Sequence, residues 1–243
     1  MKALPADASG HGNPHGLSAK LQPLFQRIFR PLLDEKRGVV EPFLTGTAKD
    51  RFKGTNDLIF DKEGNLYFTD QGQTGLHDPT GRVYRLAPDG RLDMLLSNVP
   101  SPNGVALSPD GRVLYLGSRF AGLWRSTDAA TSFQRVNAFP DSAWQRHASD
   151  GPPPSWGGSD GKATINFLLF DPASGTRGQP SRVIYAGVSV VGRPSLWVSR
   201  DAGTSWQAVP GGPTQHRPMR AALARDGQLY IAYASEPGPH RMT

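Results

Sequence analysis

The sequence predicts an all-β fold made of repeated four-stranded sheets, and three observations lead to this prediction. Glycine and proline are frequent, with 28 and 22 residues in a chain of 243, which favours many short strands separated by turns. Apolar residues alternate with a period of two from Val39 onward. Three segments share one pattern: an apolar strand, a turn with glycine, and a second strand with a Leu-Tyr pair.

The three similar segments are interpreted as β-hairpins. They read NDLIFDKEGNLYFTD at 56–70, NGVALSPDGRVLYLGS at 103–118 and RAALARDGQLYIAYAS at 220–235. Each turn needs a residue with positive φ, and glycine adopts it at little cost. The first two segments start at Asn56 and Asn103, a spacing of 47 residues, which is typical of one four-stranded blade of a β-propeller. We therefore predict a β-propeller.

The chain has enough strands for about four blades. The first blade is predicted from Asn56 to Val99, the second starts at Asn103, the third starts at Asn166, and two strands of a fourth remain at the C-terminus. Residues 39–44 could add an outer strand to that fourth blade. An open propeller exposes strand edges and a sheet face, so either the chain closes into a small ring or two copies associate as a homodimer.

The N-terminal part of the chain has a different pattern. Residues 1–16 contain few apolar residues and are predicted to be a flexible tail. In residues 17–35, leucine and phenylalanine recur at spacings of three and four with basic residues between them, which predicts an amphipathic helix. This helix could cover an apolar surface of the main domain, form a dimer contact or lie on a membrane surface. The propeller would then occupy residues 36–243.

Composition excludes several classes of function. The net charge of +6 is spread along the chain without a basic stripe, so nucleic-acid binding is not expected. The absence of cysteine excludes disulfides and thiolate metal sites. No apolar run approaches the ~20 residues of a membrane span, and the N-terminus lacks the apolar centre of a signal peptide. We expect a soluble, cytoplasmic protein.

The first part of the predicted propeller resembles a known family. The motifs NDLIFD, NLYFTD and PNGVALSPDG occur between Val40 and Leu116 in the order and spacing of the sugar-lactonase family, which includes gluconolactonase, senescence marker protein and luciferin-regenerating enzyme. Members of that family are six-bladed propellers with one divalent cation, usually calcium, in the central channel. The resemblance implies a hydrolase-like propeller that acts on a small lactone or ester.

The resemblance also implies a set of site residues. Asn103 matches a metal-binding asparagine, Asn56 matches a residue that faces metal or substrate, and Asp70 lies near the same channel. This implies a calcium site of Asn103, Asn56 and Asp70, with Asp57, Asp70 and His77 as candidate catalytic residues. The family's first-blade glutamate and a later aspartate ligand have no counterpart here. The alternative is that Asn56 and Asn103 cap strand starts by binding nearby backbone.

The second part of the predicted propeller resembles a different family. The segments STDAATSF at 126–133 and SRDAGTSW at 199–206 follow the Asp-box pattern of sialidase-type propellers. From Tyr115 to Thr243 the chain resembles Asp-box glycosidases of the xyloglucanase type. The resemblance implies structural roles for Asp128, Phe133, Asp201 and Trp206, and it suggests a chimera joined between Val113 and Gly122, of natural or engineered origin.

The insertion at 139–166 is the remaining candidate surface. Trp144 and Trp156 lie there among glycine, proline and serine, and exposed indoles often stack on sugars, so we predict a glycan-binding shelf. Glycoside hydrolysis needs two carboxyl groups about 5–10 Å apart, and no such pair is identified. Three functions therefore stay open: a lactone or ester hydrolase, a non-catalytic carbohydrate-binding or scaffold propeller, and an endo-acting glycosidase of β-glucan or xyloglucan.

Overall fold

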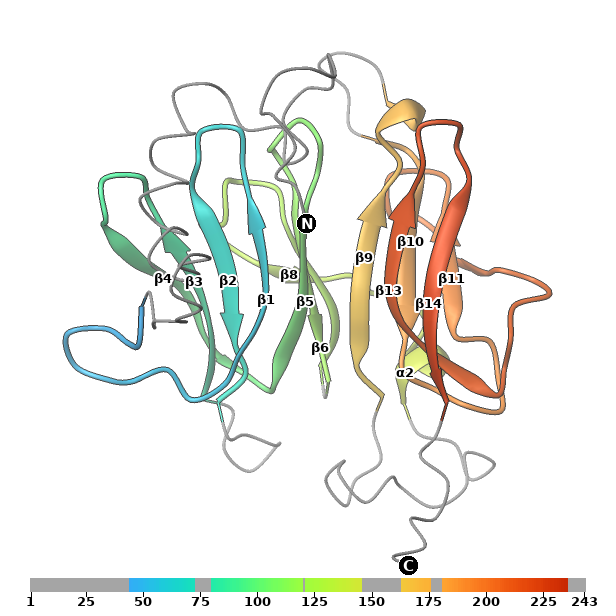
Figure 1. Cartoon of the computed structure of the whole chain (residues 1–243), viewed down its shortest axis with the longest axis horizontal. Coiled ribbons are helices and arrows are strands. Elements are labelled where there is room, and N and C mark those ends of the chain that lie inside the picture. The colour runs from blue at the N-terminus through green and yellow to red at the C-terminus, as the bar shows by residue number, and fades with distance from the viewer. Residues whose placement is uncertain (1–43, 73–79, 120, 146–162, 176–180, 236–243) are drawn as a thin grey trace, which may run out of the picture.

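A computed structural model describes residues 44–72, 80–119, 121–145, 163–175 and 181–235 (Figure 1). Four antiparallel sheets make up nearly all of the regular secondary structure in this part of the chain, so the predicted all-β class is confirmed. The tail predicted at 1–16 and the helix predicted at 17–35 lie outside the described residues.

Three sheets have four strands each, in chain order, and the fourth has two. The first sheet contains β1 (Thr55–Phe60), β2 (Leu66–Asp70), β3 (Gly81–Leu86) and β4 (Leu92–Val99). The second contains β5 (Pro102–Leu107), β6 (Leu114–Ser118), β7 (Gly122–Ser126) and β8 (Gln134–Arg135). The third contains β9 (Ile165–Phe170), β10 (Ile184–Val188), β11 (Leu196–Ser199) and β12 (Gln207–Ala208), and the fourth contains β13 (His216–Leu223) and β14 (Leu229–Ser235). These are the segments that the sequence repeats assign to blades.

The first strand of each sheet is its innermost strand. β1 contacts β5, β5 contacts β9, and β9 contacts β13, so the four innermost strands follow one another across the middle of the molecule (Figure 1). Two short helical segments lie between sheets, α2 (Asp141–Trp144) and the 3-10 turn η2 (Pro172–Ser174). Of the stretch 39–44, predicted as an outer strand of the last sheet, only Leu44 is described, and it lies against the first sheet outside any strand.

The tyrosines of the Leu-Tyr pairs form contacts between successive sheets. Tyr67 of β2 belongs to one apolar cluster with Ala130, which lies in the β7–β8 turn of the next sheet. Tyr115 of β6 donates a hydrogen bond of 3.3 Å to the carbonyl of Ala202, in the β11–β12 turn of the following sheet. Tyr230 has the same place in the last sheet, where its side chain is 61% exposed. The repeated tyrosine therefore joins one sheet to the next.

Candidate functional site

Every innermost strand is interrupted by a β-bulge at the same position. Between two paired positions, each innermost strand has one residue more than the strand with which it pairs. The bulged residues are Asn56 and Asp57 in β1, Asn103 and Gly104 in β5, Asn166 in β9 and Met219 in β13. Bulges redirect side chains and are frequent beside active sites. Polar side chains are thus placed on neighbouring strands in the middle of the molecule.

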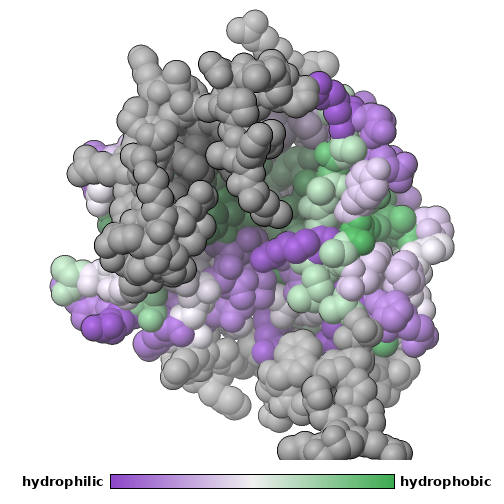
Figure 2. Space-filling model, viewed as in Figure 1, coloured by the Kyte–Doolittle hydropathy of each residue, from purple (hydrophilic) through white to green (hydrophobic). Residues whose placement is uncertain are grey.

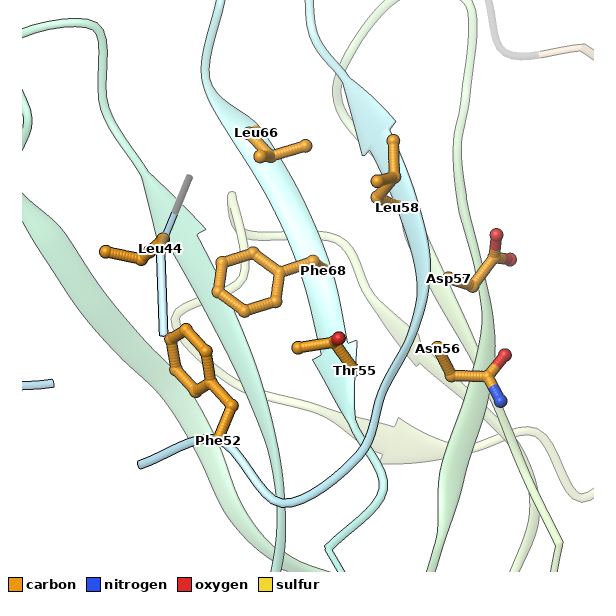
Figure 3. A pocket seen from close by; sticks show the side chains of 8 residues that line it. All are labelled: Leu44, Phe52, Thr55, Asn56, Asp57, Leu58, Leu66 and Phe68. Carbon is orange, nitrogen blue, oxygen red and sulfur yellow. The ribbon is translucent and has the colours of Figure 1, made fainter. Parts of the chain in front are cut away.

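We call Asn56, Asp57, Asn103, Asn166 and Arg220 the axial cluster. Figure 3 shows the side chains of Asn56 and Asp57 pointing together to one side of β1, away from Phe52 and Phe68. In the space-filling view, hydrophilic residues gather in the middle of the visible face (Figure 2).

Hydrogen bonds tie the bulges of β1, β5 and β9 to a strand of a neighbouring sheet. The carboxylate of Asp57 accepts the N–H of Val105 in β5 at 3.1 Å. The hydroxyl of Thr69 in β2 donates to the carbonyl of Asn103 at 2.9 Å. The amide of Asn166, 9% exposed, donates to the carbonyl of Pro218 in β13 at 2.8 Å. These contacts fix the backbone around the cluster and orient the carboxylate of Asp57.

The side chain of Arg220 in β13 connects the fourth sheet to Asp57 of the first sheet. One guanidinium nitrogen donates to the carbonyl of Asn166 at 3.5 Å, and another lies 4.0 Å from a carboxylate oxygen of Asp57. The side chain of Arg220 is 62% exposed and that of Asp57 is 21% exposed. An ion pair this open to solvent contributes little to stability, about 0 to 1 kcal/mol. Its importance is that a carboxylate and a guanidinium face one another where solutes can reach them.

The axial cluster does not fit a calcium ion. Calcium is held by six to eight oxygen ligands, several of them carboxylates in tight sites. The axial cluster has one carboxylate, Asp57, and Arg220 presents a positive charge to it. Among the residues that the structure describes, no three His, Cys, Asp or Glu side chains lie close enough to hold a metal together.

The structure corrects the role predicted for Asp70. Its side chain is 2% exposed, and its carboxylate accepts the N–H groups of Lys53 at 3.1 Å and of Gly54 at 2.7 Å. A third N–H, from Gly72, lies at 3.4 Å. A carboxylate so buried and so occupied cannot reach a substrate or a channel cation. Asp70 instead holds the loop before β1.

The structure also corrects the role predicted for Trp144. Its side chain is 4% exposed and belongs to the core of the second and third sheets. The guanidinium of Arg135 lies 5.7 Å from its ring centre. A buried indole cannot form an exposed shelf for sugars. Trp156 and His77, the two other predicted site residues of loops, lie outside the described residues.

Asp128 and Asp201 have the structural role predicted for them. Each carboxylate accepts the backbone N–H of a serine four residues later, Ser132 at 2.9 Å and Ser205 at 2.8 Å. The hydroxyl of the same serine donates to the other carboxylate oxygen at 2.6 Å. These hydrogen bonds from the serine lower the pKa of Asp128 and of Asp201 to about 2.

Sequence reasoning missed two members of the axial cluster, Asn166 and Arg220. Asn166 starts the third predicted blade as Asn56 and Asn103 start the first two, and this repeated position is the signal that could have identified it. Arg220 carries no such signal, because its contact with Asp57 joins residues from opposite ends of the described chain.

Two families of known proteins are similar to this chain. The family described as SMP-30/Gluconolactonase/LRE-like region matches residues 25–151. Xyloglucanase Xgh74A of Acetivibrio thermocellus is 36% identical over 191 residues, which cover 76% of this chain and 21% of that protein. Gluconolactonase of Zymomonas mobilis is 45% identical over 76 residues, 28% of this chain and 21% of that enzyme. The chain thus spans about a fifth of the length of these curated relatives.

Solved structures show the same two resemblances. The GH74 xyloglucanase from Xanthomonas campestris superposes with a TM-score of 0.60 and 35% identity, covering 76% of this chain and 27% of that one. The gluconolactonase XC5397 from the same organism superposes with a TM-score of 0.52 and 21% identity, covering 81% and 59%. Both are β-propellers, so the predicted fold class is confirmed; the blade number and the homodimer stay predictions.

The two similarities overlap along the chain. The family match continues beyond Leu116, where the lactonase-like part was predicted to end. The 191 residues aligned with the xyloglucanase are more than the stretch 115–243 contains, so that similarity reaches into the first two sheets. A chimera with a sharp join between Val113 and Gly122 therefore stays a prediction. No helix in the described ranges is long and apolar enough to cross a membrane.

Proposed function

The chain belongs to the SMP-30/gluconolactonase/LRE-like family, and from this premise we propose that the axial cluster hydrolyses small sugar lactones or related esters. The observation that carries the proposal is the placement of Asp57. It lies on a bulged innermost strand, is oriented by the N–H of Val105, and faces the guanidinium of Arg220 at 4.0 Å. An oriented carboxylate beside an exposed cation is a suitable pair for attack of water on a carbonyl group.

In the proposed reaction Asp57 is the general base. It removes a proton from a water molecule whose oxygen bonds to the carbonyl carbon of the lactone. The negative charge that develops on the carbonyl oxygen is stabilised by Arg220 and by amide groups of the axial cluster. The bond from the carbonyl carbon to the ring oxygen then breaks, and the proton held by Asp57 passes to that oxygen. The product is the open-chain hydroxy acid.

The proposal uses no calcium ion. The resemblance to sugar lactonases implies one, but the axial cluster offers a single carboxylate that already faces a positive charge. Arg220 supplies the positive charge that a channel cation supplies elsewhere. We therefore expect turnover of lactones to be the same in calcium and in chelator.

The experiment is turnover of glucono-δ-lactone and of an aryl ester by the whole chain, measured above the spontaneous rate. The substitution Asp57→Asn keeps an oxygen to accept the N–H of Val105 but removes the base, so we expect kcat to fall by about 100-fold or more. Asp201→Asn is the matched control, because Asp201 binds only within its own hairpin. Equal activity of wild type and Asp57→Asn would contradict the proposal.

Carbohydrate binding without turnover is the second candidate function. It is favoured by the asparagine amides of the bulged strands, since such groups bind sugar hydroxyls, and by the similarity to xyloglucanases. A glycosidase is less well supported, because the axial cluster provides one of the two carboxyl groups that glycoside hydrolysis needs. Binding of xyloglucan oligosaccharides, with neither lactone turnover nor release of reducing sugar, would favour this second function.

A further inference from the structure

The outer face of the first sheet carries two apolar rows across its four strands. One row pairs Leu58, Phe68, Tyr84 and Met94, and the other pairs Phe60, Leu66, Leu86 and Leu92. The opposite face of this sheet packs on the second sheet through Tyr67, Val105 and Leu114. At the two ends of the first row, Leu58 is 52% exposed and Met94 is 56% exposed. The middle of the two rows is buried, since Leu66, Phe68, Tyr84 and Leu86 are each at most 7% exposed. The apolar surface available to a partner therefore lies at the ends of the rows.

A pocket of about 260 Å³ opens on the outer face (Figure 3). Phe52 lies within it, with its ring centre 5.3 Å from that of Phe68 and 5.2 Å from that of Tyr84. Leu44, the first residue that the structure describes, lines the same pocket and is 36% exposed. The chain before Leu44 therefore starts from the outer face itself.

We propose that residues 17–35 of the same chain bind the outer face of the first sheet as an amphipathic helix. Their apolar residues recur at spacings of three and four, which gives a helix one apolar side. These residues are Leu17, Leu21, Leu24, Phe25, Ile28, Phe29, Leu32 and Leu33. Lys20, Arg27 and Arg30 lie between them and would face solvent. The apolar side matches a face whose two rows consist of aliphatic and aromatic side chains.

Distances along the chain favour this segment over a second copy of the protein. Residues 36–43 connect it to Leu44, and eight residues span at most about 28 Å. Four strands are about 14 Å wide, and a helix of 19 residues is about 28 Å long, so the segment can reach any part of the outer face. Covalent attachment also gives the segment an effective concentration that a separate molecule at ordinary concentration does not have.

The test uses the absence of cysteine in the chain, which allows one label at one chosen position. A nitroxide on Ser97→Cys, an exposed position of β4 near Met94, should broaden the backbone amide signals of residues 17–35 in the full-length protein. The same label on Tyr230→Cys, in the last sheet, is the matched control and should leave those signals sharp. The broadening from Ser97→Cys should not change when the sample is diluted.

A second variant separates docking from mere proximity. Met94→Asp places a charge on the outer face at a position where the side chain is 56% exposed, and it should remove most of the broadening from the Ser97→Cys label. Tyr230→Asp should not change it. The proposal is overturned if the Ser97→Cys label leaves residues 17–35 sharp. It is also overturned if, in a mixed sample, the label on one molecule broadens the segment of another, since a second copy is then the occupant.

Discussion

The first sheet and the hairpins of the second and third sheets use aspartate in different ways. In the first sheet, Asp57 and Asp70 accept N–H groups from residues 48 and 16 to 17 positions away in the sequence. In the hairpins, Asp128 and Asp201 accept N–H groups four positions away. The hairpin carboxylates stabilise a turn, and the first-sheet carboxylates join distant segments. Among these four acids, only Asp57 also faces a cation from another sheet.

Blades with similar strands and turns can therefore carry different chemistry. A local hairpin network is the same in both copies, because all its donors and acceptors lie within one turn. The environment of Asp57 depends on which strands surround it, since β5 supplies the N–H and β13 supplies the guanidinium. A related blade with other neighbours would keep its turn and lose this site.

The largest stability effect is expected at Asp70. Asp70→Ala leaves the N–H groups of Lys53 and Gly54 without their acceptor, which should lower the free energy of unfolding by about 2 to 4 kcal/mol. Denaturant unfolding measures this loss. Asp201→Ala should cost clearly less, because the exposed turn can bind water instead. Equal losses at the two positions would remove the contrast between distant and local carboxylates.

The next largest loss of stability is expected at Gly203 in the β11–β12 turn, where the β7–β8 turn has Ala130. Gly203 has a φ of 86°, and a Cβ added there would lie 2.1 Å from the hydroxyl oxygen of Tyr115. Gly203→Ala should therefore destabilise the protein by about 2 to 3 kcal/mol through backbone strain and overpacking. The double variant with Tyr115→Phe should recover part of the loss in thermal unfolding. No recovery would mean that the hydroxyl is not the obstacle.

A smaller, stabilising effect is expected in the β7–β8 turn, which contains Asp128. Ala129 is exposed and has a φ of 56°, so Ala129→Gly relieves a left-handed conformation and should stabilise the protein by about 0.5 to 1 kcal/mol. Ala130 has a φ of 66° but is 3% exposed. In Ala130→Gly the lost burial of its methyl group, about 0.8 kcal/mol, should offset the relief. Chemical denaturation of both variants checks this order.

The smallest effect is expected from the titration of Asp128 and Asp201. Their pKa of about 2 lies below the ordinary value of 3.8, so they stabilise the folded state fully above pH 4. That contribution is lost as the pH falls from about 4 to about 2. The double variant Asp128→Asn with Asp201→Asn should therefore show a shallower fall of melting temperature across this range. An unchanged pH profile would contradict the assigned hydrogen bonds.

Features that depend only on residues close together along the chain could be predicted from the sequence. The Leu-Tyr hairpins and the two serine-aspartate turns are such features, since strand alternation and turn chemistry are local. The burial of Trp144 was not predictable in this way. The residues around it suggest an exposed loop, whereas in the fold Gly122 comes so close that a Cβ there would lie 2.9 Å from the indole. The pairing of Asp57 with Arg220 also depends on how the sheets assemble.

Binding of ligands at the axial cluster can be followed residue by residue in an NMR titration. Gluconate, the open-chain product of glucono-δ-lactone, is added to isotope-labelled full-length protein. We expect the side-chain amide signals of Asn56 and Asn103 and the Nε signal of Arg220 to shift together with one dissociation constant. Arg220→Gln should abolish these shifts. Shifts confined to other parts of the protein, or shifts that survive Arg220→Gln unchanged, would show that gluconate does not bind at the axial cluster.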